Sequence, residues 1–179
     1  MKKKVVVISS GGMDSTTLMY EMLQRGHQVK TLGFDYGQRH RKELQHADAL
    51  ATHAGVPFEV ANLASIGPLI AGESSQLRDD IDVPEGHYAA NNMKTTVVPN
   101  RNMIMLSVAT GYAISQKFDA VAYGAHAGDH DVYPDCRAAF TNALAGAIAL
   151  CDWHPIELWR PFVSLTKANI CKLAISVIG

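Results

Sequence analysis

The chain has 179 residues, a length that suits one globular domain and would bury roughly 70% of the unfolded chain's surface. Hydrophobic residues make up 47% of it and charged residues 18%, which excludes a disordered or fibrous protein. Sixteen Lys and Arg balance seventeen Asp and Glu, giving a formal net charge of -1. Composition therefore argues against direct binding to nucleic acid.

The sequence shows no membrane or secretion signal. No stretch approaches the roughly 18 apolar residues of a membrane span, and the apolar run after the N-terminal lysines is too short for a signal peptide. We therefore expect a cytoplasmic protein without membrane contact. Its cysteines, Cys136, Cys151 and Cys171, are odd in number and widely spaced, so they encode neither a disulfide framework nor a zinc ribbon.

Strand and helix patterns alternate along the whole chain. The expected strands are residues 5–8, 28–35, 57–61 and 120–123, with an extended segment at 156–162, and the expected helices are one after the first glycines and others at 42–54, 102–117, 137–150 and 166–177. Such alternation implies parallel strands with right-handed crossovers. We therefore predict one α/β domain over residues 1–179, built on a doubly wound open parallel sheet.

A long loop interrupts this alternation at about residues 62–96. It holds five acidic residues between Glu73 and Glu85 against one basic residue, Arg78, and shows no hydrophobic period. Loops of this length are usually lids over a functional site or disordered segments, and the sequence leaves both interpretations open.

The turn after the first strand is typical of an anion site. Residues 10–16, SGGMDST, place two glycines between a strand and a helix, where unpaired N–H groups and the helix dipole attract negative charge. Ser10, Ser15 and Thr16 add hydroxyls, and Asp14 would repel phosphate unless a cation bridges the two. The run lacks the lysine of a Walker A motif and the spacing of a dinucleotide fingerprint. It is either a pyrophosphate cradle with a magnesium-holding Asp14 or a plain turn with Asp14 or Ser15 as N-cap.

This run resembles the SGGxDS signature of the PP-loop ATP pyrophosphatases. The resemblance implies an adenine nucleotide alpha hydrolase-like fold, ATP as the cofactor and magnesium at Asp14. It also implies cleavage of ATP between its α and β phosphates. The nucleotide-binding residues expected from it are Ser9, Ser10, Gly11, Gly12, Met13, Asp14, Ser15, Thr16, Thr17, Leu18 and Met19.

Three further segments resemble one branch of that superfamily, the 7-cyano-7-deazaguanine synthases. They are residues 34–40 (FDYGQRH), 96–102 (TVVPNRN) and 123–137 (YGAHAGDHDVYPDCR). The resemblance implies a ligase of queuosine biosynthesis that turns 7-carboxy-7-deazaguanine, ammonia and ATP into the nitrile preQ0. The implied partners are that small-molecule deazapurine carboxylate and ammonia, and a homodimer is compatible with the family.

The implied chemistry assigns roles to particular residues. Adenylation gives a carboxylate a good leaving group, so Asp14, Ser15 and Arg101 are the expected catalytic residues. Arg39 and Arg101 follow strands and would clamp phosphate or carboxylate, although loop arginines are often only solvated. The expected substrate-binding residues are Tyr36, Gln38, Arg39, His40, Asn102, His126, Asp129, His130, Tyr133, Asp135 and Arg137.

Other interpretations of these residues stay open. Asn100 and Asn102 alternatively cap the following helix. The loop from His126 to Asp135 contains ligand types for a metal, whereas the family resemblance favours Asp135 as an acceptor for a purine amine. Cys136 is expected to be a packed residue rather than a nucleophile.

One feature of the family is not found in residues 1–179. Its members carry a four-cysteine zinc cluster after the last common helix, and residues 1–179 contain no such cluster, so we expect no zinc ligands here. Rival functions are another PP-loop adenylating enzyme, either a tRNA thiolation enzyme or an amide-forming synthetase, and a noncatalytic module that binds adenine nucleotides.

Overall fold

The computed structural model describes residues 1–39, 42–78, 80 and 95–179. His40 and the middle of the loop expected at 62–96 lie outside these residues. At the described edges of that loop, the chain forms the short helix α3 (Gly67–Ile70), which the sequence analysis did not predict.

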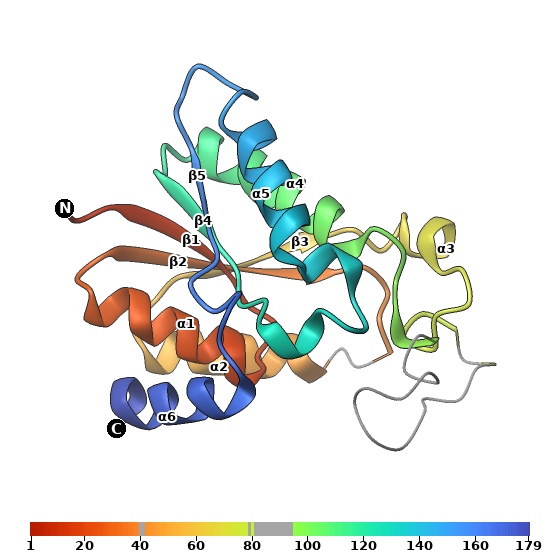
Figure 1. Ribbon diagram of the computed structural model, residues 1–179, viewed down its shortest axis with the longest axis horizontal. Helices are drawn as coiled ribbons and strands as arrows, with labels where there is room; N and C mark the ends of the chain where they lie inside the picture. The colour runs from red at the N-terminus through yellow and green to blue at the C-terminus, as the bar shows by residue number, and fades with distance from the viewer. Residues whose placement is uncertain (40–41, 79, 81–94) are drawn as a thin grey trace.

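The described strands form one sheet of five parallel strands in the order β3-β2-β1-β4-β5. The doubly wound open parallel sheet is thus confirmed. Figure 1 shows β1 and β2 in the middle of the molecule, with β4 and β5 rising from them. The bounds are β1 (Lys4–Ile8), β2 (Gln28–Asp35), β3 (Phe58–Asn62), β4 (Ala120–Ala122) and β5 (Glu157–Trp159).

Helices cover both faces of the sheet. Figure 1 shows α1, α2 and α6 on one face and α4 and α5 on the other. These helices match the expected ones within two residues at each end, which is the usual uncertainty of a helix terminus. Their bounds are α1 (Met13–Gln24), α2 (Lys42–His53), α4 (Arg101–Ser115), α5 (Ala138–Ile148) and α6 (Lys167–Ile178), with two short 3₁₀ turns, η2 (Ala127–Asp129) and η3 (Pro134–Cys136).

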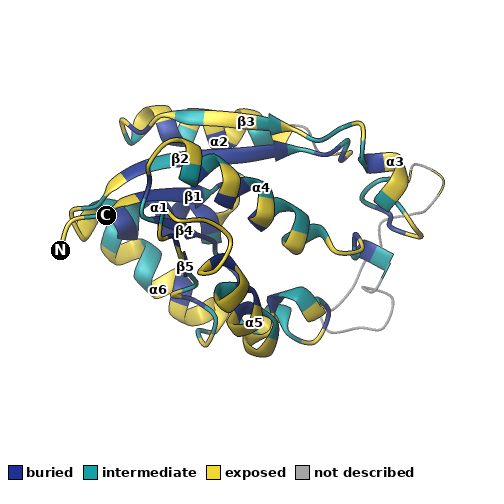
Figure 2. Ribbon diagram, turned by 90° about the horizontal axis from the view of Figure 1, so that it is seen from above, coloured by how far each residue is buried: buried dark blue, intermediate teal, exposed yellow. Residues whose placement is uncertain are grey.

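The central strand β1 is buried on both faces, and Val5, Val6 and Val7 are fully buried. Val6 faces the core beneath α4 and α5, whereas Val5 and Val7 face the core beneath α1 and α6. Figure 2 shows the middle of β1 as buried, between helices whose exposed residues face outward. A strand covered on both sides needs apolar residues at every position, which is why β1 reads as a continuous β-branched run.

None of the helices in the described part of the chain is long and apolar enough to cross a bilayer.

Candidate active site

A cavity of about 360 Å³ lies at the carboxyl ends of β1, β2 and β4. The chain order reverses between β1 and β4, and open parallel sheets bind ligands at such points. The segments that the sequence singled out therefore converge on one site. The expected residues that line the cavity are Ser9, Ser10, Asp14, Ser15, Tyr36, Gln38, Arg101, Asn102, Asp129 and Tyr133.

The glycine turn is held in place by the helix beside it. Gly11 has a φ of 78°, and a Cβ on it would lie 2.5 Å from the carbonyl oxygen of Glu43 and 2.9 Å from the amide nitrogen of Ala47. Both atoms belong to the backbone of α2, which cannot give way as a flexible side chain can. Gly11 is thus required for the close approach of α2, in addition to its left-handed conformation.

The hydroxyl groups of the turn form hydrogen bonds within the turn itself. Ser15 Oγ and Thr16 Oγ1 both donate to the carbonyl oxygen of Gly12, at 3.0 and 2.9 Å, and the amide of Ser10 donates to Ser15 Oγ at 3.3 Å. The N-cap of α1 is Gly12, without a side-chain hydrogen bond, so neither Asp14 nor Ser15 caps the helix. The first amides of α1 are therefore left for an anion.

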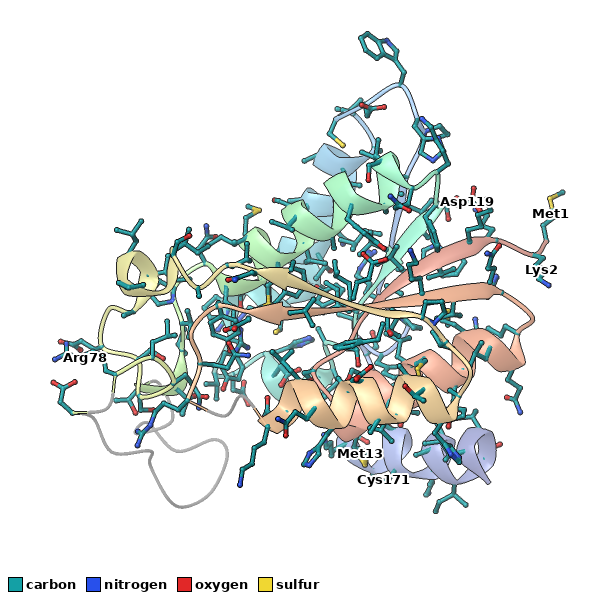
Figure 3. The ribbon with its side chains drawn as sticks, turned by 180° about the vertical axis from the view of Figure 1, so that it is seen from behind. Met1, Lys2, Met13, Arg78, Asp119 and Cys171 are labelled. Atoms are coloured by element: carbon teal, nitrogen blue, oxygen red, sulfur yellow. The ribbon has the colours of Figure 1, made fainter. Side chains whose placement is uncertain are left out.

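Asp14 is paired with a lysine that the sequence analysis did not single out. Lys167 Nζ donates to both carboxylate oxygens of Asp14, at 2.7 and 2.6 Å. Lys167 is the first residue of α6, which packs against α1, and Figure 3 shows Met13 and Cys171 together where the two helices meet. A cation at a helix N-terminus opposes the dipole and needs an anionic partner, which was the signal available in the sequence.

His126 faces the same carboxylate from the other side. Its Nδ1 accepts from the amide of Gly128 at 3.0 Å, so in the neutral ring the proton lies on Nε2. That Nε2 lies 3.6 Å from Asp14 Oδ2 and 3.7 Å from Asp129 Oδ1. His126 is buried, does not line the cavity and connects the glycine turn to the loop after β4.

Arg101, the first residue of α4, supplies positive charge in the wall of the cavity. Its guanidinium carbon lies 5.7 Å from the ring centroid of Tyr133, whose hydroxyl is 2.8 Å from Thr96 Oγ1. Burial opposes the charge on Arg101, but Tyr36, Tyr133 and Asp135 outweigh it and keep the pKa of the guanidinium above its ordinary value. Arg101 is a fixed cation that can bind a carboxylate or phosphate.

Asp135 and Asn102 join the loop after β4 to the start of α4. Asp135 Oδ2 accepts from the amide of Asn102 at 3.0 Å, and Asn102 Nδ2 lies 3.2 Å from Cys136 Sγ. The N-cap residue Asn100, at φ 59°, makes no capping side-chain bond. Asp135 thus accepts a hydrogen bond from the first turn of α4, as an asparagine N-cap would otherwise do.

Several other expected residues either do not line the cavity or line it with a side chain whose hydrogen bonds are made within the fold. Gln38 lines it, but its amide is used within the loop after β2, accepting from the amide of Tyr36 at 2.9 Å and donating to Phe34 at 3.0 Å. The expected substrate residues that do not line it are Arg39, His126, His130, Asp135 and Arg137. The expected nucleotide residues that do not line it are Gly11, Gly12, Met13, Thr16, Thr17, Leu18 and Met19, the last two of which are in the core beneath α1.

Within residues 1–39, 42–78, 80 and 95–179, no three His, Cys, Asp or Glu side chains gather closely enough to hold a metal ion on their own. The loop from His126 to Asp135 therefore does not form a protein-only metal cage. The described residues therefore do not fit a zinc site.

Cys136 lies in the wall of the cavity as a neutral thiol. Burial, followed by the charges of Asp129 and Asp135, raises its pKa to about 12. We expect iodoacetamide at pH 8 to label the exposed Cys151 and Cys171 and to leave Cys136 unmodified until the protein is unfolded, because the thiolate is the reactive form. Peptide mass spectrometry of native and denatured samples checks this, and rapid labelling of native Cys136 would contradict it.

Comparison with known proteins identifies the family. The family model described as "Queuosine biosynthesis protein QueC" matches residues 4–177. The chain belongs to the QueC family. The 7-cyano-7-deazaguanine synthase of Pseudoalteromonas translucida is 49% identical over 170 residues, which are 95% of this chain and 77% of the relative. The enzyme of that name from Methanoregula boonei is 47% identical over 174 residues, 97% of this chain and 79% of the relative.

Solved structures show that this QueC chain shares its fold with PP-loop enzymes, as expected. A predicted subunit of tRNA methyltransferase from Methanocaldococcus jannaschii has a TM-score of 0.62 at 14% identity, over 97% of this chain and 74% of the other. The NH3-dependent NAD synthetase of Campylobacter jejuni has a TM-score of 0.55 at 18% identity, over 98% and 64%. A 4-thiouridine synthetase solved with RNA and bound ATP has a TM-score of 0.58 at 17% identity, over 98% and 40%.

Proposed function

We propose that the chain is an ATP-dependent carbon–nitrogen ligase that converts 7-carboxy-7-deazaguanine and ammonia into 7-cyano-7-deazaguanine. Its relatives bear the name of that product. The observation that carries the proposal is the convergence of four separate segments on one cavity: the glycine turn, the loop after β2, the start of α4, and the loop after β4. The homodimer implied by the family resemblance remains an expectation.

The first step in this proposal is adenylation of the substrate carboxylate. The amides at the start of α1 bind the triphosphate, and Arg101 holds the carboxylate across the cavity. A carboxylate oxygen attacks the α-phosphorus, and the bond to the bridging oxygen breaks to release pyrophosphate. Fixed donors around these oxygens stabilise the charge that develops in the transition state, at roughly 3 kcal/mol for each donor.

The second step forms the carbon–nitrogen bond. Ammonia attacks the acyl adenylate, AMP leaves, and loss of a proton gives the primary amide. A second ATP then adenylates the amide oxygen with release of pyrophosphate, and this oxygen leaves as part of AMP while both nitrogen protons are lost, which produces the nitrile. Ammonia is the nucleophile in this step, because Cys136 is a neutral thiol and the thiolate is the reactive form.

Asp14 fits a magnesium ion that arrives with ATP. Mg²⁺ in phosphate-transfer sites needs one or two protein carboxylates, since phosphates and water supply its other ligands. Asp14 is half-buried at the turn where the phosphates would bind, and Lys167 offsets its repulsion toward them. When bound, magnesium would neutralise the leaving pyrophosphate.

The test is direct turnover. We expect the purified chain, incubated with ATP, ammonium and 7-carboxy-7-deazaguanine, to produce a compound of the mass of the nitrile together with pyrophosphate. Reactions without ATP or without ammonium are the controls, and they should not yield the nitrile. Recovery of only the starting carboxylate from the complete mixture would count against this function.

A further inference from the structure

Gln76 lines the cavity, and the mechanism above gives it no role. It lies in the described part of the segment between α3 and α4. Its backbone is fixed on both sides, because its amide donates to Ser74 Oγ at 3.3 Å and its carbonyl oxygen accepts from the amide of Arg39 at 3.1 Å. The polar group that Gln76 can offer to a ligand is therefore its side-chain amide.

The side-chain amide of Gln76 is unused in the fold. It forms no hydrogen bond with any residue that the structure describes, and its two polar atoms remain accessible although Gln76 is half-buried. The side-chain amides of Gln38 and Asn102 also line the cavity, but both are engaged. Gln38 bonds within its own loop, and Asn102 Nδ2 lies 3.2 Å from Cys136 Sγ. Of these three amides, that of Gln76 has both its donor and its acceptor available.

A short series of contacts connects Gln76 to the cation in the cavity wall. The preceding residue, Ser75, is fully buried, and its amide donates at 2.7 Å to the carbonyl oxygen of the residue just before Thr96. Thr96 lines the cavity, and its Oγ1 lies 2.8 Å from the hydroxyl of Tyr133. The ring of Tyr133 faces the guanidinium of Arg101. Gln76 thus belongs to the part of the site that is proposed to hold the substrate carboxylate.

The chemistry of a side-chain amide indicates what it binds. The carboxylates of Asp14, Glu43 and Asp129 also line the cavity, and an ionised carboxylate only accepts hydrogen bonds. An amide donates and accepts side by side, so it pairs with a ring edge that carries a carbonyl oxygen next to an N–H group. The lactam of 7-carboxy-7-deazaguanine is such an edge, and its carbonyl oxygen lies on the same side of the ring system as the carboxylate. The contacts that lead from Gln76 to Arg101 therefore favour this acid over the adenine ring of ATP.

We propose that the side-chain amide of Gln76 forms a pair of hydrogen bonds with the lactam edge of the deazapurine, and that Gln76 is a specificity-determining residue for this reaction. Arg101 binds the carboxylate and Gln76 binds the ring, so the acid is held at two points. This inference rests on the proposed function, since it takes the substrate to be a deazapurine carboxylate.

The test is Gln76→Met, which keeps the length of the side chain and removes both the donor and the acceptor. Calorimetry should show that 7-carboxy-7-deazaguanine binds the variant at least about tenfold more weakly, because two hydrogen bonds are lost. KM for that acid should rise with kcat nearly unchanged, and the affinity for ATP should stay within about twofold. The Tm of the ligand-free protein should stay that of the wild type, because the amide has no partner in the described part of the fold.

Gln45→Met is the matched control, because Gln45 is exposed on α2 and does not line the cavity. It should bind the acid as the wild type does. Equal affinity of Gln76→Met and wild type for the acid, in a protein that makes the nitrile, would overturn this inference and leave the proposed function standing. Weaker binding of ATP would assign Gln76 to the nucleotide, a lower Tm would assign it a structural role, and either result would also overturn the inference. A wild-type protein that neither binds nor converts the acid would overturn both proposals.

Discussion

Asp14→Asn is expected to reduce pyrophosphate release by about a thousandfold or more while the protein stays folded. The change keeps the shape of the side chain and removes the negative charge that the proposal assigns to the metal that accompanies ATP. The ion pair with Lys167 is partly exposed, with side-chain exposures of 24% and 54%, and such pairs contribute less than about 1 kcal/mol. A coupled assay for pyrophosphate and a thermal unfolding curve measure the two effects.

Glu59→Gln is the control for this experiment. It also removes a carboxylate from an ion pair with a lysine, in this case Lys30 at 2.8 Å, but on β3 and away from the cavity. It should leave pyrophosphate release unchanged. Turnover of Asp14→Asn at the wild-type rate would remove Asp14 from the mechanism, and a large loss of stability would mean that the Lys167 pair is mainly structural.

The sequence predicted the sheet well because each strand and helix carries its own periodic pattern. The strand expected at residues 28–35 has the bounds of β2, and the helix expected at 42–54 differs from α2 by one residue. The cavity could also be predicted, since residues after parallel strands meet at one edge of the sheet. These features depend on local sequence and on a general rule of topology.

The pairing of side chains within the site could not be predicted in the same way. Lys167 reaches Asp14 across 153 positions of sequence, and its place on the first turn of α6 became meaningful only once α6 lay beside α1. Gln76 lies in the loop without a hydrophobic period, and its unused side-chain amide is visible only when all of its neighbours are in place. Such contacts depend on tertiary packing, which periodicity does not encode.

Gly11 shows how one sequence feature can have a different physical cause from the one expected. The sequence pattern links the glycine pair to an anion site. The structure adds a second cause, the close approach of the α2 backbone to Gly11. The shape of the nucleotide turn therefore depends on the packing of α2, and a change at Gly11 should affect stability and ATP binding together.

Gly11→Ala is accordingly expected to destabilise the protein by about 3 kcal/mol or more, through left-handed strain and a clash with backbone atoms. Gly26→Ala separates the two causes, because Gly26 has nearly the same φ, 79° against 78°, but a Cβ there would meet no atom within 4 Å. It should cost only about 1 kcal/mol, the strain alone. Urea unfolding gives both free energies. Equal losses in the two variants would mean that α2 can move away from the turn, whereas a larger loss for Gly11→Ala, together with weaker ATP binding, shows that α2 holds the nucleotide turn in its active shape.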